Sequence, residues 1–129
     1  MNIKIYIISF ILFFNTFAFG NLIRPEGGAE LSYIHVLFEW EQEPDAIGYN
    51  LQVSTQQLFN NPILDINEPT TIYIEKNNIS WDGNYYWRVR PLYSDGGSGS
   101  WIESEFSIKE SILTDLDVNI YNDDLIQDG

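Results

Sequence analysis

The chain has 129 residues and no cysteine, and 44% of its residues are hydrophobic and 16% aromatic, so a hydrophobic core must hold the fold without disulfides. It carries 19 acidic and 6 basic residues, which gives a formal net charge of −13 at pH 7. This charge leaves no basic stripe that could neutralise phosphates, and it excludes nucleic acid and anionic lipid as expected partners.

The start of the chain is predicted to be a signal peptide. A positive charge at Lys4 precedes an apolar run over residues 5–14. Ala18 and Gly20 then place small residues three and one before a cleavage site, which makes Asn21 the first residue of the exported protein. The alternatives are an anchor helix or a core helix, but the run is shorter than the roughly 20 apolar residues of a membrane span. We therefore expect a secreted, periplasmic or cell-surface protein with no membrane span after cleavage.

From residue 22 to residue 108 the chain shows short alternating runs separated by turn residues, which is typical of an antiparallel β-sandwich. An irregular initial segment contains Pro25 and two glycines. The strand-like runs that follow are His35–Trp40, Gly48–Ser54, Pro62–Asp65 as a short edge strand, Thr70–Ile74, Tyr85–Arg90 and Trp101–Ile108. No run in this region has helical spacing.

Alternation also predicts which side chains point inward. The inward faces carry Val36, Phe38 and Trp40 in one run, Tyr49, Leu51 and Val53 in the next, and Tyr85, Trp87 and Val89 in a later one. His35 falls on the opposite face, and Asn50 and Gln52 are expected to face water.

Three features resemble a fibronectin type III domain over about residues 22–109. A strand ends in Trp40, where the family has a core tryptophan, and Ile79 lies six residues before Tyr85, as the family's apolar residue lies before its tyrosine-corner residue. Tyr85, Trp87 and Val89 then alternate along the next strand. The corner has a physical basis, because the tyrosine hydroxyl satisfies a backbone group at the turn entering the strand.

The runs from Tyr49 and from Tyr85, the latter followed by Trp101, are also similar to type III modules of bacterial secreted and surface proteins. The resemblance implies an all-β, seven-stranded antiparallel, immunoglobulin-like sandwich. It implies a core of Val36, Phe38, Trp40, Tyr49, Leu51, Val53, Ile79, Tyr85, Trp87 and Val89. The family's cell-adhesion tripeptide is absent, so no integrin-binding role carries over.

Arg88 and Arg90 are predicted to leave their strand on the face opposite Trp87 and Val89. Trp101 begins the neighbouring strand, so its ring can stack on both guanidinium groups as cation–π contacts. Cytokine-receptor type III domains build a similar ladder, and this resemblance implies a structural role for the three residues. The alternative is that the two arginines bind a ligand.

No catalytic, cofactor-binding or metal-binding residue is predicted. His35 is the only histidine, and no cysteine or motif-borne serine accompanies it as a nucleophile. Glu39, Glu41 and Glu43 are spaced by two and could align as carboxylates that hydrolyse glycosides or bind calcium. We favour three like charges on one solvated face, and we expect no enzyme activity from these residues.

The segment Ser94–Gly99 is predicted to be a flexible hairpin loop and the candidate binding surface, since loops on a rigid sandwich commonly carry recognition. It consists of Ser94, Asp95, Gly96, Gly97, Ser98 and Gly99. The loop has no aromatic anchor at its tip, so strong protein binding is not indicated. A protein and a carbohydrate both stay open as ligands.

Residues 110–129 differ in composition from the sandwich, because they include six acidic residues and no basic one. The segment Asp115–Asn119 opens like an EF-hand loop, but Ile120 and Ile126 stand where that loop requires glycine and glutamate. Alternation over Asp117–Tyr121 instead predicts a strand that needs a partner. The chain thus divides into a signal peptide (1–20), a sandwich (21–109), and an acidic linker with the first strand of a downstream domain (110–129).

Two classes of function are open. The first is a non-catalytic, monomeric exported module that acts as a spacer, positioning or binding domain of a larger secreted protein. The second is the leading part of an exported enzyme, because Asp115–Gly129 behind a sandwich resembles the start of secreted aryl-sulfate sulfotransferase-like proteins. None of that family's catalytic residues falls within this sequence, and the catalytic propeller would lie beyond residue 129.

Overall fold

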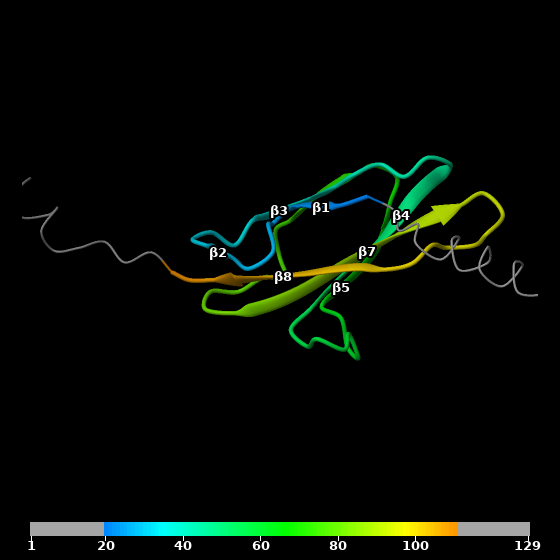
Figure 1. Ribbon diagram of the computed structural model, residues 1–129. Coiled ribbons are helices and arrows are strands. Elements are labelled where there is room, and N and C mark those ends of the chain that lie inside the picture. The colour runs from blue at the N-terminus through cyan, green and yellow to red at the C-terminus, as the bar shows by residue number, and fades with distance from the viewer. Residues whose placement is uncertain (1–19, 111–129) are drawn as a thin grey trace, which may run out of the picture.

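The computed structural model describes residues 20–110, which form two β-sheets packed face to face (Figure 1). The strands are β1 (Leu22–Arg24), β2 (Ala29–Leu31), β3 (Val36–Trp40), β4 (Ala46–Ser54), β5 (Leu64–Glu68), β6 (Ile72–Glu75), β7 (Asn84–Tyr93) and β8 (Ile102–Ile108). One sheet has the order β1-β3-β6 and the other β2-β8-β7-β4-β5. The all-β sandwich predicted from the alternating runs is therefore confirmed. Over these residues no helix is long and apolar enough to cross a membrane.

The initial segment forms two short strands, one in each sheet. β1 pairs antiparallel with β3, and β2 pairs parallel with β8. Between them the chain crosses from one sheet to the other through a cis Arg24–Pro25 bond and through Gly28, whose φ of 77° suits glycine. The described part of the chain therefore has eight strands where seven were expected, and one of its pairings is parallel.

The two sheets enclose a core that is rich in aromatic rings. The ten residues named above for the core are all buried, none more than 5% exposed, and Phe106 and Ile108 of β8 join them. The Phe38 ring packs edge-on against Trp87 and Phe106, with centroids 5.1 and 5.8 Å away. Neither Trp40 nor Trp87 has a hydrogen-bond partner for its indole N–H among the described residues, so both rings stabilise the fold by packing.

A hydrogen-bonded corner closes the connection that enters β7. The Tyr85 hydroxyl accepts a hydrogen bond from the Ser80 backbone N–H at 2.8 Å and lies 3.3 Å from the Ser80 carbonyl oxygen, to which it can donate. Ile79 is buried beside it. The ring lies so close to Gly83 that a Cβ there would come within 2.6 Å of it, so only glycine fits beneath the corner.

Two expectations about individual elements are wrong. The edge strand β5 runs from Leu64 to Glu68, so it begins two residues later and ends three residues later than the predicted run over 62–65. Asn50 does not face water, because it is only 6% exposed. Its side chain does point away from the core, but other side chains cover that face of the sheet. The predicted signal peptide, apart from Gly20, and the predicted strand over 117–121 lie outside the described residues.

Candidate functional site

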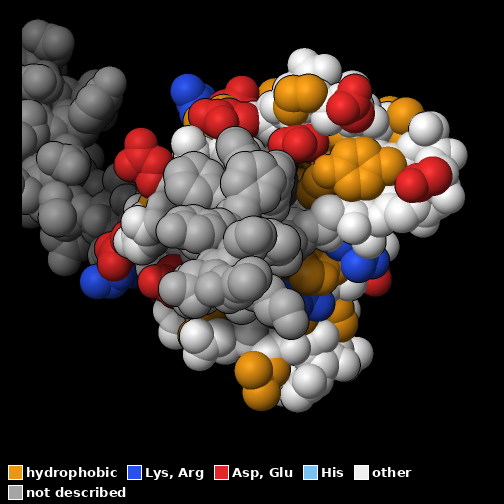
Figure 2. All heavy atoms as spheres, turned by 45° about the vertical axis from the view of Figure 1, so that its right-hand side comes forward, with side chains coloured by type: hydrophobic (Ala, Val, Ile, Leu, Met, Phe, Trp, Pro, Cys, Tyr) orange, Lys and Arg blue, Asp and Glu red, His pale blue; other side chains and the backbone are white. Residues whose placement is uncertain are grey.

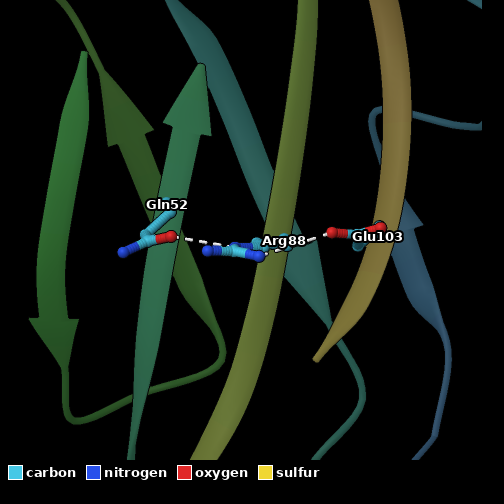
Figure 3. A network of polar contacts seen from close by, with 3 residues as sticks. All are labelled: Gln52, Arg88 and Glu103. Atoms are coloured by element: carbon cyan, nitrogen blue, oxygen red, sulfur yellow. Dashed lines mark hydrogen bonds and ion pairs between the residues drawn. The ribbon is translucent and has the colours of Figure 1, made fainter. Parts of the chain in front are cut away.

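The outer face of the five-stranded sheet carries a row of polar side chains centred on β7. The strand pairing places Arg88 opposite Gln52 of β4 and opposite Glu103 of β8. The Arg88 Nε donates a hydrogen bond to the Gln52 Oε1 at 2.8 Å, and an Arg88 terminal nitrogen lies 3.5 Å from the Glu103 Oε1. Figure 3 shows the three side chains in one line across the three strands. The row ties the middle of the sheet together from its outer side.

Aromatic rings stack on the arginines of this sheet face. The Arg88 guanidinium carbon lies 4.2 Å from the centre of the Phe59 ring and 4.1 Å from the centre of the Trp101 ring. The Arg90 guanidinium carbon lies 4.4 Å from the Trp101 centre. The structure thus brings together the three residues expected to form a ladder and adds Phe59, which the sequence showed only as an apolar residue in a polar loop.

Asn50 and Asp65 extend the network to the edge strand β5. The Arg90 Nε donates to the Asn50 Oδ1 at 3.3 Å, and the Asn50 amide nitrogen donates to an Asp65 oxygen at 2.8 Å and to the Ile66 carbonyl at 3.0 Å. The Gln52 amide nitrogen donates to the other Asp65 oxygen at 3.0 Å. Asn50 is buried because these partners satisfy both ends of its amide.

This network has the properties of a structural brace. Both faces of the Arg88 guanidinium are covered by rings, and its side chain is only 21% exposed. An anionic ligand would have to break the contacts with Gln52 and Glu103 before it could bind bidentately. The bound arginines also pin Phe59 and Trp101, which belong to two different loops, onto the sheet.

Glu75 is a second buried polar group, at the end of β6, and it is 1% exposed. One carboxylate oxygen accepts hydrogen bonds from the Asn77 backbone N–H at 2.7 Å, the Asn78 backbone N–H at 3.1 Å and the Asn78 side chain at 3.2 Å. Burial by itself raises the pKa of Glu75, but the hydrogen bonds outweigh it and hold the pKa below the ordinary value. Glu75 therefore stays ionised and fastens the turn after β6, whereas a general acid needs a raised pKa.

The remaining acidic and histidine candidates do not converge on a site. His35 is exposed on the surface. Glu39 forms an ion pair with Arg24 at 3.5 Å, and Glu41 accepts hydrogen bonds from the backbone and side chain of Asn21 at 3.1 and 3.3 Å. Over residues 20–110, no three histidine, cysteine or carboxylate side chains are grouped so that they could hold a metal ion.

The predicted loop over 94–99 forms a hydrogen-bonded hairpin turn. The Tyr93 N–H donates to the Gly97 carbonyl at 2.9 Å, and the Gly96 N–H donates to the Tyr93 carbonyl at 3.0 Å. The Asp95 carboxylate accepts from the Gly97 N–H at 2.8 Å, and Gly96 has a φ of 87°. The loop is therefore a defined, exposed projection from the end of β7.

Comparison with known proteins identifies the fold. No family model matches the chain, and no curated protein matches it significantly. The structure is similar to an Fn3-like protein from Clostridium thermocellum, with a TM-score of 0.54, 22% identity, and coverage of 74% of this chain and 97% of that one. It is also similar to fibronectin(III)-like modules of CbhA from Clostridium thermocellum, with a TM-score of 0.50, 12% identity, and coverage of 73% and 100%. The resemblance to fibronectin type III domains is thus confirmed for the fold.

Proposed function

We propose that this fibronectin type III-like sandwich is a non-catalytic module of an exported protein, where it spaces or positions a neighbouring domain and contacts a partner through one of its ends. The observation that carries the proposal is the path of the chain. Asn21 enters the sandwich beside Glu41, at the end of β3, and Lys109 leaves it beside Leu31. Figure 1 shows the start of β1 directed to one end of the sandwich and the end of β8 directed to the other.

Entry and exit at opposite ends suit a spacer, because consecutive domains are then held a full domain length apart. The polar groups of the sheet face support the same interpretation, because they already have partners within the sheet. Arg88 is bound to Gln52 and Arg90 to Asn50, and both amide side chains are bound to Asp65. In this proposal residues 1–20 direct export, residues 21–109 form the module, and residues 110–129 connect it to a downstream domain. No comparison supports the sulfotransferase-like resemblance of Asp115–Gly129, which is not part of the proposal.

Export is tested by expressing the full chain in a Gram-negative host and measuring the mass of the protein in each compartment. We expect a product outside the cytoplasm that lacks the first 20 residues and begins at Asn21. Ala18→Phe is the matched control, because a bulky residue three before the cut should block cleavage. A full-mass product that stays in the cytoplasm would contradict the proposal.

A further inference from the structure

The end of the sandwich where β4 begins carries an apolar hollow. A bulge in the pairing of β4 with β7 lies between Ala46 and Gly48, so Ile47 has no partner in β7, and it is 64% exposed. A hollow of about 230 Å³ opens beside it. The hollow is lined by Ile47, Tyr49, Pro69 and Leu92, with Gly48, Asn67 and Glu68 completing it. Its walls are mainly carbon, and this distinguishes it from the polar hollows elsewhere on the sandwich.

Carboxylates from several segments lie at this end of the sandwich, and one of them lines the hollow. Glu68 lines it directly, opposite Tyr49 in the strand pairing. Asp45 stands two residues before Ile47, and Asp95 stands two residues after Tyr93, which pairs with Ala46. Burial raises the pKa of Tyr93, and the charges of Glu43, Asp45 and Asp95 raise it further. The last three acids come from the loops before β4 and after β7, so both loops bring negative charge to one place.

No basic side chain of residues 20–110 lines the hollow. In Figure 1 the β3–β4 and β7–β8 loops lie at the same end of the molecule. Figure 2, in which that end is turned forward, shows exposed hydrophobic side chains with acidic side chains beside them, and Lys or Arg side chains on another part of the same face. The hollow itself therefore combines apolar walls with acidic residues, Glu68 in its lining and Asp45 two residues before Ile47.

We propose that this hollow docks a basic and apolar peptide segment of a partner protein, an inference that rests on the proposed binding role of the module. An apolar side chain of the partner fills the hollow against Ile47 and Leu92, and lysine or arginine side chains on either side of it pair with Asp45, Glu68 and Asp95. Burial of apolar surface supplies affinity, and the complementary charges supply specificity and a fast encounter.

Charge also argues against other occupants. A second copy of this chain would bring two sets of acidic residues together, which opposes association. Anionic groups are repelled for the same reason, and a glycan requires convergent polar groups that the carbon walls of the hollow do not offer. A basic peptide segment with an apolar side chain matches both the walls and the acidic residues.

The test is an NMR titration of the isotope-labelled exported chain with a capped peptide, Lys-Lys-Leu-Leu-Lys-Lys. We expect amide shifts concentrated at Ile47, Gly48 and Leu92. The peptide Lys-Lys-Ser-Ser-Lys-Lys keeps the charge and should bind roughly tenfold more weakly, because it cannot fill the hollow. Glu-Glu-Leu-Leu-Glu-Glu keeps the apolar residues and should not bind.

Matched variants locate the contact. Ile47→Ser should weaken binding of the leucine peptide roughly tenfold, whereas Ile74→Ser, at a 50% exposed isoleucine on the other sheet, should leave it unchanged. Asp45→Asn should weaken binding and reduce its salt dependence. Both serine variants change exposed side chains, and unchanged amide spectra away from each site will show that the fold is retained.

Several results would overturn the docking inference. These are equal binding of the serine and leucine peptides, equal effects of the two isoleucine variants, shifts spread over the acidic surface, and no binding at millimolar peptide. Self-association that Ile47→Ser abolishes would show that a second copy occupies the hollow, and it would also overturn the inference. None of these results bears on export or folding. The export experiment therefore tests the proposed function independently of peptide binding.

Discussion

Tyr85 fixes its turn through one hydroxyl group. Replacing Tyr85 with Phe removes the acceptor of the Ser80 N–H, which is bound at 2.8 Å. The free energy of unfolding should fall by about 0.5–1.5 kcal/mol for the lost hydrogen bond. The decrease should reach about 3 kcal/mol if no water replaces the hydroxyl as the partner of the Ser80 N–H. Urea unfolding at neutral pH measures the effect. Tyr33→Phe is the matched control, because Tyr33 is 51% exposed and should give an unchanged midpoint. Equal midpoints for both variants would show that the corner is not stabilising.

Glu75 links the stability of the sandwich to pH. Its pKa in the folded protein lies below the ordinary value of 4.5, so the ionised group stabilises the fold above that pH. The contribution is lost as the pH falls from about 4.5 through the lower pKa of the folded protein. Glu75→Gln should therefore destabilise the protein at pH 7 by about 1.5–3 kcal/mol, as expected for hydrogen bonds to a charged group.

The pH dependence of the destabilisation by Glu75→Gln is the control for this prediction. Every other acidic residue is the same in both proteins, so the difference between their unfolding free energies isolates Glu75. We expect this difference to be largest near neutral pH and to shrink below pH 4.5. A difference that stays constant over the acid range would mean that the Glu75 charge does not hold the turn.

The brace on the five-stranded sheet acts through a ring shared by two arginines. Trp101→Leu removes the ring that lies 4.1 Å from Arg88 and 4.4 Å from Arg90, and it should lower stability by roughly 0.5–2 kcal/mol. A double-mutant cycle with Arg90→Gln separates stacking from the loss of apolar area. A coupling energy near zero between the two substitutions would show that the stacked contact contributes nothing.

The strand pattern could be predicted from the sequence because one face of each strand is buried, and burial imposes a period of two. This is why the inward faces of β3, β4 and β7 follow the alternation at Phe38, Leu51 and Trp87. The same reasoning misplaced Asn50, because it equates the outer face with water. Here the β4–β5 loop and the arginines cover the outer face of the five-stranded sheet. The alternation of residues within β4 does not indicate either of them.

Loop geometry explains why the roles of Phe59 and Ile47 could not be predicted from the sequence. Leu58 and Phe59 are adjacent apolar residues in one polar loop, and the alternation of a strand does not extend into a loop. The structure buries Phe59, at a φ of 54°, and leaves Leu58 78% exposed. Ile47 could not be identified either, because an inserted bulge residue changes the strand phase without a signal in the sequence.

The whole molecule has two unlike ends. At one end, hydrogen bonds of the Glu75 and Tyr85 side chains close the turn after β6 and the corner before β7. The chain leaves beside them, since Asn84 pairs with Ser107. At the other end, β7 finishes at the exposed 94–99 turn, next to Ile47 and the hollow. This polarity separates the expected attachment to a downstream domain from the expected contact with a partner.

We propose that residues 21–109 fold as a self-sufficient module that needs no metal and nothing downstream. The direct measurement is urea unfolding of two polypeptides, residues 21–109 and residues 21–129, each with and without a chelator and at several protein concentrations. We predict one cooperative transition with the same midpoint in all cases, because the buried core and its hydrogen bonds lie within the shorter chain. Three results would contradict self-sufficient folding of residues 21–109. They are an unfolded short polypeptide, a midpoint for it well below that of the longer one, and a midpoint that depends on chelator or protein concentration.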